Sequence, residues 1–346
     1  MERQRPLRLV LWGLGAMGRE MAAIVLQRPG LAIAGAIDRN PARAGRDLGE
    51  VLGLGGEMGI HVSPQPEGVL DTVDADMALI ATGSLLDYVY PQVRAALEAG
   101  LDVITIAEEM AYPWAAGRER AEELDRLARA RGKRVLGTGI NPGFVLDTLI
   151  IAMTGVCWKV ERIRARRVND LSPFGPTVMA SQGVGTTPEG FRRGVEEGRI
   201  VGHIGFPQSM HLIARAVGWE LESVREEREP IISATYREAP HVRIAPGQVA
   251  GCRHTARGFV AGREAIVMEH PQQVEPAAEG VETGDYIIIE GEPGLSLAIQ
   301  PEIPGGKGTA AIAVNMIPLV RQAPAGLLTM ADLPVPRAAL GELMTQ

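Results

Sequence analysis

Gly13, Gly15 and Gly18 have the spacing that a backbone needs to wrap around a phosphate group. They follow an apolar run and open a segment with helical periodicity, the setting in which a G-x-G-x-x-G sequence binds a dinucleotide. The first glycine makes the tight turn, the second lets the backbone approach the pyrophosphate, and the third lets helix and strand pack closely. Ala16 and Met17 begin the helix, whose unpaired N–H groups favour negative charge. The motif therefore predicts an NAD(P) site.

Asp38 stands twenty residues after Gly18, at the end of the second apolar run. An acid at this place accepts hydrogen bonds from the adenosine ribose hydroxyls and favours NAD. Arg39 follows at once, and its guanidinium can stack on adenine or pair with the 2′-phosphate of NADP. The two side chains favour opposite cofactors, and we expect NAD to be slightly preferred with NADP accepted.

Further candidate residues follow later apolar runs of the same pattern. Thr82 and Gly83 come after the run 77–81, where a loop would cross near the nicotinamide ribose; a plain turn is the alternative. Asn141 follows the run that starts at Arg134, and its side chain could bind the cofactor's carboxamide or a substrate. All three residues are therefore predicted to lie where ligands bind an open parallel sheet.

Glu108 and Glu109 come directly after the apolar run 102–106. Side chains at the carboxyl end of a parallel strand point into the cleft where the nicotinamide would lie. Because adjacent residues point to opposite sides, we expect one carboxylate, and not both, to face the cofactor. The alternative is that both are solvent-facing acids at a helix N-terminus, with no part in chemistry.

Alternating strands and helices are predicted to position these residues. The strands are 7–12, 31–37, 77–81, 102–106 and 134–137, and the helices are 19–27, 91–99 and 116–131. This alternation predicts an α/β fold whose N-terminal domain, residues 1–150, is a doubly wound Rossmann domain.

The pattern changes after residue 150. Short strand candidates separated by proline and glycine turns occupy 160–168, 231–236, 242–244, 255–260, 265–270, 286–290 and 295–299, with few helices among them. This texture predicts a second α+β domain of largely antiparallel sheet over residues 151–309. The glycine-rich segment 305–309 is expected to be a loop, and 310–346 to pack back on the first domain through a helix at 310–322.

Composition excludes several classes of protein. A formal net charge of −7 argues against a nucleic-acid surface, which needs clustered positive charge. No stretch approaches the roughly 20 apolar residues of a membrane span. Cys157 and Cys252 have no metal-ligand spacing, so we expect no metal site. We expect a cytoplasmic protein that acts on a small molecule.

Several blocks taken together resemble one family. They are 13–18, 106–110, 138–143, 168–179, 315–320 and 326–334, of which the Asn-Asp-Leu-Ser-Pro-Phe-Gly-Pro sequence beginning at Asn169 is the most specific. On these blocks the chain resembles the 2,4-diaminopentanoate dehydrogenase family, which includes the native amine dehydrogenases and is similar in fold to dihydrodipicolinate reductase. The resemblance covers nearly the whole chain.

The resemblance implies a reaction and a set of site residues. The reaction is reversible oxidative deamination, in which an amine and NAD(P)⁺ give a carbonyl compound, ammonia and NAD(P)H. The essential acid maps to Glu108, because a carboxylate can hold an ammonium or iminium group and accept a proton. The substrate pocket is implied to lie between the domains, with Asn315 near the cofactor. The pocket candidates are Glu109, Phe144, Asn169, Asp170, Ser172, Phe174, His270 and Thr309.

Other interpretations stay open from the sequence. Asn169 to Ser172 could simply form a turn, and His270 could be a surface residue at a strand end. The same scaffold could reduce a cyclic imine or a C=C bond, as dihydrodipicolinate reductase does, or serve a non-enzymatic NAD(P)-binding regulator.

The second domain also suggests an assembly. The predicted strands 265–269 and 286–290 carry the apolar residues Ile266, Val267, Ile287, Ile288 and Ile289. They are too apolar for both faces of the sheet to be wet, and we expect too few helices to cover them. We therefore predict a homodimer joined through second-domain sheets, an arrangement that the resemblance also implies.

Overall fold

The computed structural model describes residues 5–338 and 340. The chain divides into two compact units: residues up to Phe144 with the segment from Pro304 onward, and Val145–Ile303. The sequence placed these boundaries after residues 150 and 309 instead. They differ because helix α6 (Thr148–Thr154) belongs wholly to the second unit and helix α10 (Gly305–Asn315) wholly to the first.

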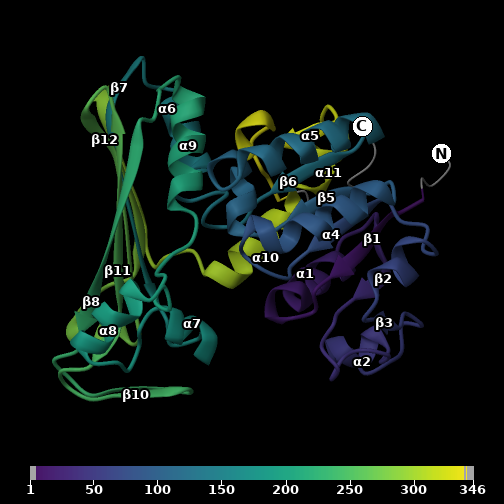
Figure 1. The fold of residues 1–346 in the computed structure, drawn as a ribbon, viewed down its shortest axis with the longest axis horizontal. Helices are drawn as coiled ribbons and strands as arrows, with labels where there is room; N and C mark the ends of the chain where they lie inside the picture. The colour runs from purple at the N-terminus through teal and green to yellow at the C-terminus, as the bar shows by residue number, and fades with distance from the viewer. Residues whose placement is uncertain (1–4, 339, 341–346) are drawn as a thin grey trace. The chain divides into compact units, whose positions relative to one another are not determined.

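The first unit is built on a parallel sheet of seven strands (Figure 1). Its order is β15-β6-β5-β4-β1-β2-β3, and every neighbouring pair is parallel. The strands are β1 (Leu7–Trp12), β2 (Leu31–Ile37), β3 (Val62–Ser63), β4 (Met77–Ile80), β5 (Asp102–Thr105), β6 (Arg134–Gly137) and β15 (Gly326–Leu328). Strands β4, β5 and β6 are buried almost throughout, as expected for a parallel sheet with helices on both of its faces. The doubly wound fold expected for this unit is confirmed.

Helices connect these strands. They are α1 (Ala16–Leu26), α2 (Leu48–Leu52), α3 (Pro66–Leu70), α4 (Leu86–Glu98), α5 (Arg118–Arg131), α10 and α11 (Ile317–Gln322). Val103 and Val135 of the sheet share one buried cluster with Val93 of α4 and Leu124 of α5. This packing removes apolar surface from water, the main favourable term in folding.

The C-terminal segment completes the first unit. Helix α10 lies beside α1, and β15 extends the parallel sheet next to β6. Arg321 of α11 donates to the buried carboxylate of Asp102 at 2.7 Å. The segment 305–309, expected to be a loop, is the first part of α10. Helix α4 begins at Leu86 rather than at Pro91, which lies inside the helix.

The second unit is built on a mixed, mostly antiparallel sheet. Its six strands run in the order β14-β13-β7-β12-β11-β8, and β7 and β12 form the parallel pair. They are β7 (Lys159–Asp170), β8 (Ser223–Ile232), β11 (Val249–Val260), β12 (Arg263–Gln273), β13 (Gly284–Glu292) and β14 (Leu295–Ile299). A separate hairpin joins β9 (Arg237–Ala239) and β10 (Val242–Ile244). The largely antiparallel second domain is thus confirmed.

The faces of this sheet differ from those expected. Besides α6, the unit has helices α7 (Pro176–Ser181), α8 (Pro188–Glu196) and α9 (Phe206–Val217), and Figure 1 shows α6 and α9 along one side of the sheet. Ile266, Ile287 and Ile289 are fully buried, whereas Ile288 is 37% exposed. The apolar strand residues are therefore largely buried within the unit, and the expectation of too few helices was wrong.

The opposite face of the sheet is charged. Arg164 of β7 lies opposite Ile288, and Arg166 lies opposite Glu269 of β12, so these side chains share a face. Arg164 pairs with Glu290 at 2.9 Å and Arg166 with Glu269 at 3.5 Å. A face of this kind is compatible with water, so its composition alone does not require a partner.

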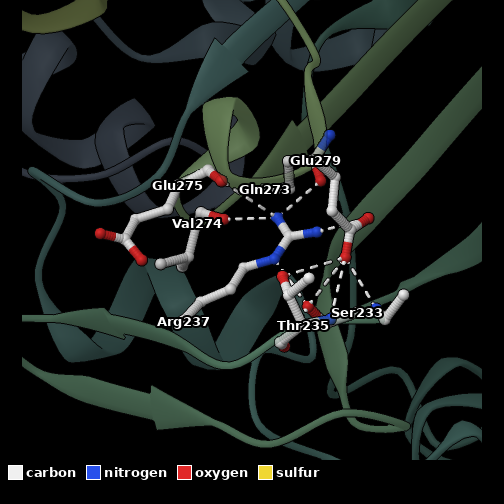
Figure 2. A network of polar contacts seen from close by, with 8 residues as sticks. Ser233, Thr235, Arg237, Gln273, Val274, Glu275 and Glu279 are labelled. Atoms are coloured by element: carbon white, nitrogen blue, oxygen red, sulfur yellow. Dashed lines mark hydrogen bonds and ion pairs between the residues drawn. The ribbon is translucent and has the colours of Figure 1, made fainter.

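Arg237 anchors the loop 233–239 to the end of β12 (Figure 2). Its guanidinium is fully buried and donates to the Ser233 hydroxyl at 2.7 Å, the Gln273 side chain at 2.8 Å and the Val274 carbonyl at 2.7 Å. It also forms an ion pair with Glu279 at 2.9 Å. The network therefore replaces the water that a buried guanidinium loses.

No helix between residues 5 and 338 is both long and apolar enough to cross a bilayer.

Candidate functional site

The three motif glycines of the first unit have distinct surroundings. Gly13 has a positive φ of +95°, and a Cβ there would lie 2.5 Å from the Ala81 carbonyl oxygen. A Cβ on Gly18 would lie 1.8 Å from the Gly13 carbonyl oxygen. A Cβ on Gly15 would have no heavy atom of the described residues within 4 Å. The glycine assigned to pyrophosphate approach thus has open space next to it, and the turn fits a dinucleotide.

Asp38 lies at the carboxyl end of β2 and is 8% exposed. One carboxylate oxygen accepts from Leu14 N at 2.6 Å, and the other accepts from Asn40 N at 2.7 Å. The bond to Leu14 ties the acid to the glycine turn. Arg43, which sequence reasoning missed, forms an ion pair with Asp38 at 3.1 Å, whereas Arg39 is exposed.

The loop after β4 contacts both the glycine turn and the turn that contains Glu108 and Glu109. The Thr82 hydroxyl donates to Gln92 at 2.6 Å, and the ring of Tyr88 fills the place of a Gly83 side chain. Ser84 O accepts from Glu109 N at 3.1 Å. Thr82 and Gly83 thus lie in a fixed turn, with the Thr82 hydroxyl already engaged by protein.

Glu108 and Glu109 begin a short 3-10 turn, Glu108–Ala111, directly after β5. The Glu109 carboxylate accepts from Leu86 N at 2.6 Å and so holds the start of α4. Burial raises the pKa of Glu108, and the charge of Glu109 adds to this, while a backbone N–H and the Ser84 hydroxyl act in the opposite sense. The two neighbours thus differ: Glu109 holds the start of α4, and Glu108 has a raised pKa.

Asn141 follows β6 and has buried side-chain oxygen and nitrogen atoms without a hydrogen-bond partner among the described residues. Close by, the Thr309 hydroxyl accepts from Ile140 N at 3.1 Å. Thr309, expected in the second domain, therefore belongs to the first unit, because α10 begins ahead of it. An unsatisfied buried amide is costly, so it fits a polar ligand group such as a carboxamide.

The topology brings these residues to one edge of the sheet. In sheet order β6, β5, β4, β1 and β2 are neighbours, and each is followed by one candidate group. These groups are Asn141, Glu108, Thr82, Gly13 and Asp38. Asn315 does not join them: it accepts from Arg28 at 2.9 Å, beyond the C-terminal end of α1, whereas the glycine turn lies at its N-terminal end.

Polar side chains also gather in the second unit, on the helix-covered face of its sheet. His270 lies directly opposite His254, and Asn169 lies opposite Gln272. The His203 ring, from the loop before α9, stacks edge-on against His270 with ring centroids 4.9 Å apart. Sequence reasoning predicted Asn169 and His270 but missed His203, because its loop has no local signal. His270 is buried and not on the surface.

Several atoms of this cluster are buried without a hydrogen-bond partner among the described residues. They are Asn169 Oδ1, His203 Nε2 and both ring nitrogens of His270. Burial lowers the pKa of His203 to about 3, and that of His270 well below its usual value, with neighbouring positive charges adding to both shifts. Both rings are therefore neutral at ordinary pH and can bond a polar ligand without charge repulsion.

Three other pocket candidates in this unit form hydrogen bonds or core contacts within the protein. Asp170 accepts from Ser172 N at 2.8 Å and from Glu275 N at 3.1 Å, and the Ser172 hydroxyl accepts from Glu275 N at 3.0 Å. Phe174 packs against a small core that includes Met179. The turn interpretation thus accounts for Asp170 and Ser172. Phe144, the last residue of the first unit, is half-buried.

No three His, Cys, Asp or Glu side chains within residues 5–338 gather as a metal ion would require.

A parallel sheet with these groups at its carboxyl edge is the nucleotide-binding domain of an NAD(P)-dependent dehydrogenase. The family model for the 2,4-diaminopentanoate dehydrogenase C-terminal domain matches residues 144–346, and that for the dihydrodipicolinate reductase N-terminus matches residues 7–105. The chain is 44% identical to 2,4-diaminopentanoate dehydrogenase of Acetoanaerobium sticklandii, over 97% of this chain and 96% of that protein. This chain belongs to the 2,4-diaminopentanoate dehydrogenase family.

Solved structures and other relatives agree. The structure of amine dehydrogenase from Mycobacterium smegmatis is similar with a TM-score of 0.85 and 31% identity, covering 98% of this chain and 99% of that one. An amine dehydrogenase of Streptomyces virginiae is 26% identical over 96% of this chain and 98% of its own length. The chain is thus an oxidoreductase of the amine dehydrogenase type.

Proposed function

We propose that this protein catalyses the reversible oxidative deamination of a small primary amine. An alkylammonium ion, water and NAD(P)⁺ give a ketone or aldehyde, ammonium, NAD(P)H and a proton. The observation that supports it most is the half-buried Glu108 with its raised pKa, which follows β5, the neighbour of β4 in the sheet. A bound nicotinamide supplies the acceptor for the hydride that leaves the amine carbon.

In this proposal Glu108 acts on the nitrogen of the substrate. Its carboxylate pairs with the substrate ammonium and accepts a proton from it, which leaves a lone pair on nitrogen to expel the hydride. After water adds to the resulting iminium carbon, the same group transfers protons while ammonia departs. Asn141, with its unpaired buried amide, is the candidate to orient the carboxamide of the cofactor.

We propose that the polar cluster of the second unit also binds substrate. We propose 2,4-diaminopentanoate, which carries two amines and a carboxylate, as the first substrate to test. Asn169, His203 and His270 together offer unpaired hydrogen-bonding atoms, and their neutral rings suit a polar chain that carries either sign of charge. Ammonia is the second partner in the reverse direction.

Either nicotinamide cofactor is accepted in this proposal. Asp38 favours NAD slightly, because it can accept hydrogen bonds from the ribose hydroxyls, and the nearby arginines admit NADP.

A second chemistry has one observation in its favour. Cyanobacterial 4-hydroxy-tetrahydrodipicolinate reductases match about 45% of this chain, among them that of Nostoc at 34% identity. The dihydrodipicolinate reductase family model matches residues 7–105 of this chain, which lie in the first unit, and a nucleotide-binding unit hosts many reactions.

One assay separates the two. Oxidation of NADH and NADPH is followed with 2-amino-4-oxopentanoate and simple ketones, with and without ammonium. We expect turnover with ammonium and none without it, and release of ammonia from 2,4-diaminopentanoate in the other direction. Ammonium-independent reduction of a cyclic imine or a C=C bond, with no reductive amination, would instead assign the reductase chemistry.

We also propose that two copies of the chain associate through the charged face of the six-stranded sheet. Its paired arginines and glutamates, such as Arg164 with Glu290, can pair equally well across a two-fold axis.

A further inference from the structure

The Asp38 carboxylate already accepts three hydrogen bonds from protein groups. Its Oδ1 accepts from Asn40 N at 2.7 Å, and its Oδ2 accepts both from Leu14 N at 2.6 Å and from Arg43 Nη1 at 3.1 Å. A carboxylate that already has a guanidinium partner carries little net negative potential toward a third group. The ribose end of the site is therefore closer to neutral than the sequence suggested.

Arg43 is fixed in this position by the backbone that carries it. Arg43 N donates to Asn40 O at 2.9 Å, and Gly45 N donates to Val62 O at 2.8 Å, which ties the turn to β3. The side chain of Arg43 is 26% exposed. Among the described residues its guanidinium bonds only Asp38, so most of its five N–H donors remain for a ligand.

The neighbouring arginines differ in their surroundings. Arg39 is exposed and forms no hydrogen bond or ion pair with another of the described residues, so nothing fixes its direction. Arg46, three residues after Arg43, pairs with Glu50 of α2. Of the three, Arg43 is the one held against the acid that would face the ribose.

We propose that the Asp38–Arg43 ion pair is the device that lets the ribose site accept either cofactor, with Arg43 as the 2′-phosphate-binding residue. The inference rests on the proposed NAD(P) site. With NAD the ribose hydroxyls donate to Asp38; with NADP the free N–H groups of Arg43 bind the phosphate, and its charge offsets the repulsion from Asp38. Loss of Arg43 leaves an acid that repels the phosphate.

The test uses two cofactor fragments that cannot undergo hydride transfer, so it does not depend on activity. Isothermal titration calorimetry measures binding of ADP and of 2′,5′-ADP to the full chain and to Arg43→Gln, Arg39→Gln and Arg46→Gln. We expect Arg43→Gln to weaken 2′,5′-ADP about 10- to 100-fold, the range of one charge-assisted hydrogen bond. ADP binding should stay within about threefold, and Arg46→Gln should change neither ligand, because an exposed ion pair contributes little.

Two further variants test the charge of Arg43 and the repulsion from Asp38. Arg43→Lys retains the charge and should recover part of the 2′,5′-ADP affinity, and Asp38→Asn should raise that affinity by removing the repulsion. Unchanged 2′,5′-ADP binding by Arg43→Gln, or a larger loss with Arg39→Gln, would overturn the assignment, as would a wild-type protein that binds ADP and not 2′,5′-ADP. If the wild type bound neither fragment, the proposed NAD(P) site itself would fail.

Discussion

Glu108 and Glu109 are adjacent in the sequence, yet their carboxylates have different hydrogen-bond partners. Glu109 accepts a backbone hydrogen bond from Leu86 and so connects the acidic turn to the start of α4. The Glu108 carboxyl instead accepts hydrogen bonds from its own backbone N–H and the Ser84 hydroxyl, and burial raises its pKa. A general base works best when its pKa approaches the working pH, which burial of this carboxyl favours.

We expect Glu108→Gln to bind cofactor and to lose most of its turnover. The amide keeps the shape of the side chain and removes both the charge and the base, and such roles are worth about 10²- to 10⁴-fold. The measurement is kcat and KM for the amine, together with the affinity for ADP. Glu109→Gln is the matched control, since its amide oxygen can still accept from Leu86 N. If Glu109→Gln loses more turnover than Glu108→Gln, the acid has been assigned to the wrong residue.

The pH dependence of amine oxidation should reveal the raised pKa of Glu108. Glu108 must be ionised to accept a proton, so amine oxidation is lost as pH falls through its raised pKa, at a higher pH than an ordinary glutamate would give. An acid with a raised folded-state pKa destabilises the protein increasingly as pH rises from its unfolded pKa through its folded pKa. Above that window Glu108→Gln should therefore unfold at a higher temperature than the wild type, and below it the difference should vanish. Equal thermal stability at neutral pH would argue that Glu108 is not desolvated.

At the scale of elements, strand β12 of the second unit carries one residue of the polar cluster and ends beside the Arg237 network. Its residue His270 belongs to the polar cluster, and a few residues later Gln273 and Val274 receive the buried guanidinium of Arg237. Asp170 and Ser172, at the end of β7, bond to Glu275 in the same region. The network in Figure 2 thus holds the strand end that follows the cluster.

Arg237→Leu should destabilise the protein strongly. It removes the ion pair with the partly exposed Glu279 and leaves the buried Gln273 side chain without its guanidinium partner, and each buried polar group left unsatisfied costs about 1–3 kcal/mol. Arg243→Leu is the control, because Arg243 forms an ion pair with Glu238 but is 75% exposed, and exposed pairs contribute about 0–1 kcal/mol. Chemical denaturation of both variants measures the difference. Equal effects would mean that the Arg237 network stabilises no more than a surface pair.

At the scale of the whole molecule, association should depend on the charged sheet face and on salt. Light scattering at micromolar concentration should give about twice 37.0 kDa, and the dimer should weaken as salt screens the arginine–glutamate pairs. Arg164→Glu should favour the monomer by placing like charges together. Arg192→Glu, on the exposed surface of α8, should leave the mass unchanged. A wild-type monomer, or a dimer indifferent to Arg164→Glu, would rule out this interface.

Local sequence determined much of the first unit. The glycine spacing after an apolar strand, the acid at the end of β2 and the paired glutamates after β5 are set by residues within a few positions of each other. Such features follow from short-range sterics and periodicity, which is why they could be predicted. The apolar strands themselves were predicted to within about one residue in β4 and β5 for the same reason.

Tertiary structure decided the rest. Only the strand order makes Asn141, Glu108 and Asp38 share one sheet edge, and only the fold of the turn after β2 returns Arg43 to Asp38. His203 reaches His270 from a loop without periodicity, and Ile287 and Ile289 of β13 are buried within the second unit. These contacts join residues far apart in the chain, and no local preference encodes which distant surface a side chain will meet.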